Sequence, residues 1–137
     1  MIKHNYIREY YAKISSGEIK TSKKVLRQYE LLVKELDNPK MLGNNWMFDV
    51  DKATYPIDFI EKFCKKTQGT SIGQPIHLEL FQKARIQAVF GFVDKFTGLR
   101  RCRETAMIEA RKNGKTTESA GLSLYALMGD GEGGAEV

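Results

Sequence analysis

Two amphipathic helical patterns open the chain and predict a helical hairpin over residues 1–40. Asn5 is a suitable N-cap for the first helix, which Gly17 breaks, and Ser22 is a suitable N-cap for the second, which Asn38-Pro39 ends. The apolar positions are Tyr6, Ile7, Tyr10, Tyr11 and Ile14 in the first helix, and Val25, Leu26, Tyr29, Leu32, Val33 and Leu36 in the second.

The pattern of apolar and polar residues in the middle of the chain predicts one further helix and a polar loop. The stretch Trp46 to Asp51 alternates imperfectly and is either extended or a loop. Thr54 can cap the next helix, with Pro56 in its first turn, and this helix should end near Lys66. Thr67 to Gln74 is polar and contains two glycines, so we expect a loop.

A long helix is predicted from about Leu78 to Gly91. Its apolar residues extend too far round the helix for one face to be solvated freely. We therefore expect this helix to lie against a sheet.

The pattern after Gly91 changes to strand, loop and helix. Arg103 to Ile108 becomes apolar towards its end, as in a strand of a parallel sheet, and Thr116 to Met128 has helical spacing. The loop between them contains Gly-Lys-Thr at 114–116. In a phosphate-binding loop, main-chain N–H groups and the helix N-terminus surround phosphate oxygens, Lys115 contacts the β and γ phosphates, and the Thr116 hydroxyl ligates magnesium.

The loop departs from the usual pattern, which opens with glycine where this chain has Glu109. Gly-Lys-Thr alone also occurs in ordinary turns. Arg111 and Lys112 add two cations where the helix dipole is already positive, which favours a bound anion such as a polyphosphate. A basic turn without a ligand, with Arg111 paired to Glu109 or another acid, is the alternative.

Composition indicates one globular domain of 137 residues. The chain is 42% hydrophobic and 28% charged, and it contains no apolar run long enough to span a bilayer and no signal peptide. We therefore expect a cytoplasmic protein. Cys64 and Cys102 are then reduced thiols, and no Cys/His cluster has zinc spacing.

The net charge of +5 is concentrated at the front of the chain, where the first forty residues hold nine Lys or Arg and five acids. This excess suggests a contact with the DNA backbone, although a solvated lysine face is the simpler interpretation. The cations concerned are Lys20, Lys23, Lys24 and Arg27.

Several stretches together resemble the large terminase subunit of tailed bacteriophages, an ATPase and nuclease that packages DNA. Members of that family have a deviant Walker A loop containing arginine, followed by a helix, a glycine-rich turn and a strand that begins Ala-Glu-Val. The matching stretches are Met107 to Thr116, Gly129 to Val137, Asp58 to Cys64, Gly73 to Pro75, Leu78 to Gln82 and Phe90 to Phe92.

The resemblance implies ATP and Mg²⁺ as cofactors. It implies that Arg111 senses the γ-phosphate, that Gln82 reads adenine through its paired donor and acceptor, and that Thr116 ligates magnesium. The implied nucleotide-binding residues are Gln82, Asn113, Gly114, Lys115, Thr116 and Thr117. It also implies double-stranded DNA, a small terminase subunit and a portal as partners, and it allows a homo-oligomer. The implied location is the cytoplasm of the bacterial host, with no membrane contact.

We therefore predict an α/β fold in which N-terminal helices precede the opening strand, P-loop, helix and second strand of an incomplete P-loop ATPase domain. The domains would be the hairpin at 1–40 and the start of the ATPase at 41–137. No apolar strand ending in paired acids follows Thr116, and no nuclease carboxylates are present, so we expect a fragment truncated before Walker B and inactive alone. A non-catalytic module that binds DNA or the small terminase subunit, and a small P-loop kinase or nucleotidase, are the alternatives.

Overall fold

A computed structural model describes residues 3–112 and 114–131. The described part contains five α-helices, one short 3-10 helix and a two-stranded antiparallel sheet. In chain order these are α1 (Tyr6–Ser15), α2 (Lys23–Asp37), η1 (Pro39–Leu42), β1 (Trp46–Phe48), α3 (Val50–Phe63), α4 (Leu80–Phe90), β2 (Phe92–Asp94) and α5 (Lys115–Met128). None of the described helices is both long enough and apolar enough to cross a membrane.

The first two helices form as predicted. The Asn5 side chain accepts a hydrogen bond from the Arg8 main-chain N–H at 3.0 Å, and the Ser22 hydroxyl accepts one from Val25 at 3.2 Å. These bonds satisfy donors that have no partner within a helix's first turn. The second helix ends at its C-cap Asn38, directly before a proline that cannot continue it.

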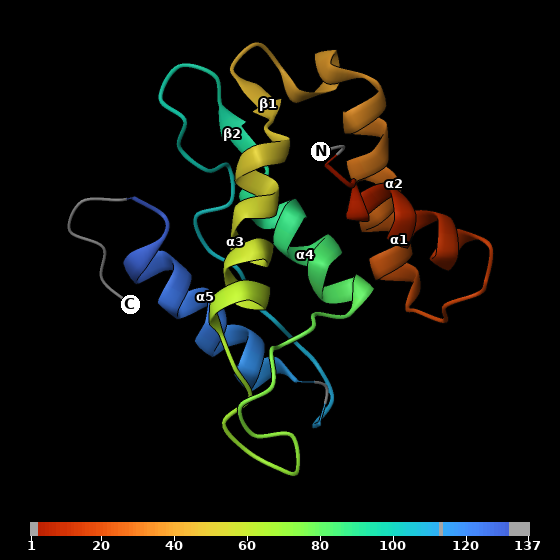
Figure 1. The fold of residues 1–137 in the computed structure, drawn as a ribbon. Helices are drawn as coiled ribbons and strands as arrows, with labels where there is room; N and C mark the ends of the chain where they lie inside the picture. The colour runs from red at the N-terminus through yellow and green to blue at the C-terminus, as the bar shows by residue number, and fades with distance from the viewer. Residues whose placement is uncertain (1–2, 113, 132–137) are drawn as a thin grey trace.

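Helix α4 lies at the centre of the molecule, between the α1–α2 pair on one side and α3 on the other (Figure 1). Ala84 belongs to a hydrophobic cluster with residues of α1 and α2, whereas Ile86 belongs to a second cluster with Ile57 and Ile60 of α3. The prediction that this helix is not freely solvated is confirmed by its buried residues. The prediction that it lies against a sheet is wrong, because helices cover it on both sides.

Helix α3 begins earlier than predicted. Its N-cap is Asp49, whose carboxylate accepts hydrogen bonds from the N–H groups of Asp51 at 2.9 Å and Lys52 at 3.1 Å. Thr54 is not the cap; its hydroxyl donates to the Val50 carbonyl one turn earlier, at 2.7 Å. Pro56 consequently lies inside the helix, which ends at Phe63.

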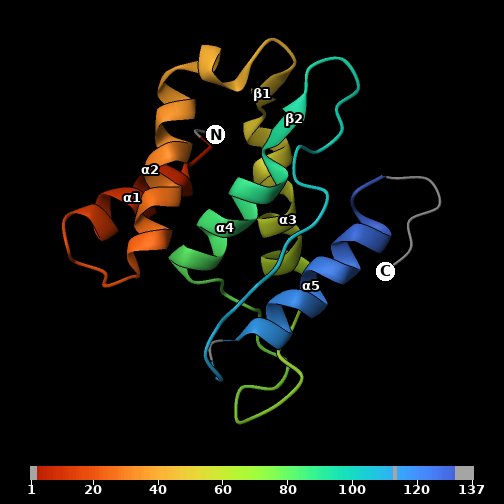
Figure 2. The same ribbon diagram turned by 180° about the vertical axis from the view of Figure 1, so that it is seen from behind.

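The predicted parallel sheet is not present among the described residues. Strands β1 and β2 pair antiparallel, with Trp46 opposite Asp94 and Phe48 opposite Phe92. Residues 103–108 were predicted to form a strand, but they form none and run as irregular chain between β2 and α5 (Figure 2). An isolated extended segment lacks the hydrogen-bonded neighbour that defines a strand. The second predicted strand, beginning at Ala135, lies outside the described residues.

Gln87 ties the chain's N-terminal segment to α4. Its side chain is fully buried, its carbonyl accepts from the Tyr6 main-chain N–H at 2.7 Å, and its amide donates to the His4 carbonyl at 2.9 Å. A buried amide is stable only when its donors and acceptors are satisfied. Gln87 therefore fixes the position at which α1 begins.

Replacing Gln87 by Leu should lower the free energy of unfolding by about 1–3 kcal/mol, because two main-chain groups lose their partners while side-chain volume is kept. Urea denaturation measures the change. Gln28→Leu, at an exposed position on α2, is the matched control and should change stability little. Equal effects of the two substitutions would contradict this role for Gln87.

Candidate phosphate-binding site

The loop before α5 contains residues with unusual backbone conformations. Lys112 and Gly114 both adopt left-handed conformations, with φ of 68° and 75°, and Lys112 is the one residue other than glycine to do so in the described part of the chain. Gly114 is the N-cap of α5, and among the described residues no side chain caps the first turn. The N–H groups at this helix start are therefore available to an external anion.

The cations of the loop face solvent. Arg111, Lys112, Lys115, Thr116 and Thr117 are all exposed. The Lys115 ammonium donates a long hydrogen bond, at 3.5 Å, to the main-chain carbonyl of Glu109. Asn113 lies outside the described residues.

Gln82 lies beside this loop. A Cβ built on Gly114 would be 3.5 Å from the Gln82 Nε2, so the loop and the carboxamide are neighbours. Gln82 is 95% buried. Its Oε1 accepts from the Glu79 N–H at 2.9 Å as part of a capping box at the start of α4. The Oε1 atom is thus used in holding the start of α4.

Arg85, one turn further along α4, links both ends of the loop. Its guanidinium forms ion pairs with Glu109 at the loop's start and with Glu118 in the first turn of α5, where its Nε lies 3.2 Å from the Glu118 Oε1. The Glu118 side chain is fully buried. Burial opposes the charge of Arg85, but the hydrogen bonds that its guanidinium donates to the two carboxylates outweigh this effect and raise the pKa of the guanidinium.

The network also shows which cation pairs with Glu109. Glu109 is paired with Arg85 and not with Arg111, and Arg111 takes part in no ion pair among the described residues. Sequence reasoning missed Arg85 and Glu118. The sequence feature that could have indicated them is that both are charged residues within predicted helices that are otherwise largely apolar.

Comparison with known proteins gives one significant relative. The chain is 45% identical over 74 residues to the terminase large subunit of Enterobacteria phage HK97. The chain is homologous to a terminase large subunit. The match covers 53% of this chain and 13% of the HK97 terminase subunit. No family model matches the chain, and no solved structure gives a significant match.

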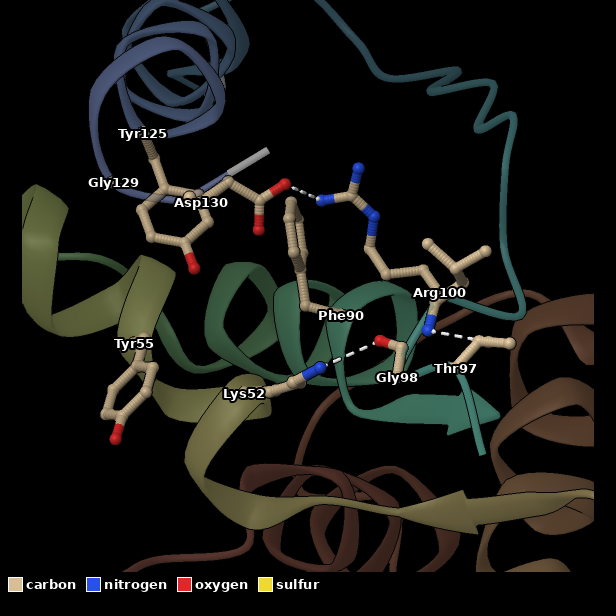
Figure 3. A pocket seen from close by; sticks show the side chains of 11 residues that line it. Lys52, Tyr55, Phe90, Thr97, Gly98, Arg100, Tyr125, Gly129 and Asp130 are labelled. Atoms are coloured by element: carbon tan, nitrogen blue, oxygen red, sulfur yellow. Dashed lines mark hydrogen bonds and ion pairs between the residues drawn. The ribbon is translucent and has the colours of Figure 1, made fainter. Parts of the chain in front are cut away.

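Two cavities among the described residues lie away from the loop's exposed face. One, of about 390 Å³, lies at the opposite end of α5, next to Tyr55, Phe90 and Tyr125 (Figure 3). There Arg100 pairs with Asp130 at 2.6 Å. Burial, and to a lesser degree the Asp130 carboxylate, raises the pKa of Tyr125 to about 12.

The second cavity, of about 530 Å³, lies between α4, α5 and the irregular segment 102–107. Arg85 and Glu118 are part of its lining. The paired side chains therefore lie between this cavity and the loop. Among the described residues, no group of three or more His, Cys, Asp or Glu side chains is arranged to hold a metal ion.

The basic residues predicted to contact DNA are exposed. Lys20 lies before α2, and three further cations lie in its first two turns. The exposed side chains are Lys20, Lys23, Lys24 and Arg27. Their positions are compatible both with contact to a phosphate backbone and with a solvated helix face.

Replacing Arg85 by Ala should lower the free energy of unfolding by about 3 kcal/mol, since it leaves the buried Glu118 carboxylate without its partner. The exposed Arg111 is the control, and Arg111→Ala should change stability by less than about 0.5 kcal/mol. Thermal and urea unfolding at pH 7 measure both variants. A loss for Arg85→Ala as small as that for Arg111→Ala would show that the network contributes little.

Proposed function

We propose that this chain is the nucleotide-binding front part of a terminase large subunit, the ATP-driven motor that packages phage DNA. The observation that carries the proposal is the uncapped start of α5, where a left-handed Gly114 precedes the exposed Lys115 and lies beside Gln82. Homology to the HK97 terminase subunit supports it.

The residues present fit ATP and Mg²⁺. The first-turn N–H groups and the Lys115 ammonium would hold phosphate oxygens, and the Thr116 hydroxyl would ligate the magnesium. Asn113 and Thr117 flank these groups in the sequence and would complete the cradle. The ion, when bound, supplies charge neutralisation between the phosphates.

Arg111 and Gln82 have the more specific roles in this proposal. Arg111 is exposed and forms no ion pair in the described part of the chain, so its guanidinium is available to the γ-phosphate. The buried Gln82 would read the adenine edge with its carboxamide. We expect turnover by these 137 residues alone to be negligible, because no apolar strand ending in paired acids follows Thr116 to hold magnesium and position the attacking water.

Mg·ATP should raise the melting temperature of the chain, because a ligand that binds the folded state stabilises it. Lys115→Ala should abolish the shift by removing a charge-assisted contact to phosphate. Lys40→Ala, at an exposed position in η1, is the control and should keep it. Differential scanning fluorimetry measures all three proteins, and an equal shift for Lys115→Ala would contradict the proposed site.

A second candidate function is non-catalytic DNA binding by the basic front of the chain, favoured by the four exposed cations at the start of α2. Double-stranded DNA and, by relation to terminases, a small terminase subunit and a portal are the partners that we propose for this chain. A self-contained kinase or nucleotidase has no comparable support.

Backbone binding should be independent of DNA sequence, and log affinity should fall with log salt by about 0.9 for each phosphate neutralised. Replacing Lys20, Lys23 and Lys24 by Gln should reduce that slope. The control changes the same number of exposed lysines elsewhere, Lys62, Lys65 and Lys66, and should leave the slope unchanged. Fluorescence anisotropy over a salt series measures the slope for each variant. An affinity for DNA that does not vary with salt would leave only the interpretation that these lysines form a solvated helix face.

A further inference from the structure

Glu109 places a carboxylate at the first position of a loop that we propose binds a triphosphate. A free carboxylate there would repel the phosphates, or would attract the Lys115 ammonium away from them. In the structure the Glu109 side chain faces inward, with 11% of its surface exposed, and is paired with Arg85 of α4. The cations of the same loop face outward.

We propose that Arg85 is a positioning residue for nucleotide binding, which neutralises Glu109 and holds its carboxylate away from the phosphate site. This inference rests on the proposed function. Arg85 touches neither phosphate nor magnesium in this proposal. It acts through Glu109, and so its effect differs from that of Lys115.

Two features of the network make this role specific. Glu118 holds Arg85 by both carboxylate oxygens and is fully buried, so this pair fixes the guanidinium in place. Glu109 is held by a single guanidinium nitrogen, and its second oxygen, Oε2, is buried without a hydrogen bond in the described part of the chain. Of the two carboxylates, Glu109 is therefore the one that Arg85 restrains.

Loss of Arg85 would release Glu109 close to Lys115. The Lys115 ammonium already lies 3.5 Å from the main-chain oxygen of Glu109, so a released carboxylate reaches it by rotation of its own side chain. An ion pair formed there would occupy the cation that the γ-phosphate requires. Arg85 therefore controls anion affinity as well as stability.

The test compares Arg85→Gln with the double variant that combines it with Glu109→Gln, using Mg·ATP in titration calorimetry. The single variant should bind Mg·ATP about tenfold more weakly or worse, because it carries an unneutralised carboxylate beside the site. The double variant should regain affinity to within about threefold of the unaltered chain. Both variants lose the Arg85–Glu118 pair, so their melting temperatures should be equally low.

The recovery separates positioning from a purely structural role, which predicts that the double variant stays as weak as the single one. Such a result, or full affinity in Arg85→Gln, would overturn this inference while leaving the nucleotide site standing. If the unaltered chain binds no Mg·ATP, or if Lys115→Ala binds it equally well, the proposed function fails and this inference fails with it.

Arg85→Lys provides the same comparison if the glutamine variant does not fold. A single ammonium retains the buried pair with Glu118 but cannot also hold Glu109 in a fork. Arg85→Lys should therefore weaken Mg·ATP binding, and adding Glu109→Gln should restore it. Weak binding in both lysine variants would overturn the proposal.

Discussion

A helix buried on both sides must satisfy every polar side chain that it carries, and α4 sets this constraint for the whole molecule. Gln82, Arg85 and Gln87 point inward from it, and each is bonded to a different part of the chain. Gln82 closes the helix's own first turn, Arg85 holds the loop and α5, and Gln87 holds the N-terminal segment. Burial of polar groups is costly unless they are paired, so these bonds fix how the surrounding elements are arranged.

Charge is sorted by direction around the loop. The carboxylates of Glu109 and Glu118 face α4, while Arg111, Lys112 and Lys115 face solvent. The Arg85 guanidinium holds both carboxylates on the inner side of the loop, while the outer side of the loop is strongly positive. This separation lets a loop with acidic residues at both ends still present a cationic face to an anion.

Local signals in the sequence predicted the elements whose ends are set by neighbouring residues. Asn5 and Ser22 cap α1 and α2 as their types suggest, and α5 begins at Lys115, one residue before the predicted start at Thr116. Partners distant in sequence could not be predicted in the same way. Residues 103–108 have the composition of a strand but no paired neighbour among the described residues, and Arg85 meets Glu118 across thirty-three positions.

The bonds of Gln87 have a consequence for how this chain can change in evolution. They join the Gln87 side chain to main-chain atoms of His4 and Tyr6, not to the side chains of these two residues. Every residue except proline offers the same N–H and C=O groups. The identities of the first few residues can therefore drift among relatives while the anchor persists, provided that Gln87 is kept and proline is excluded from position 6.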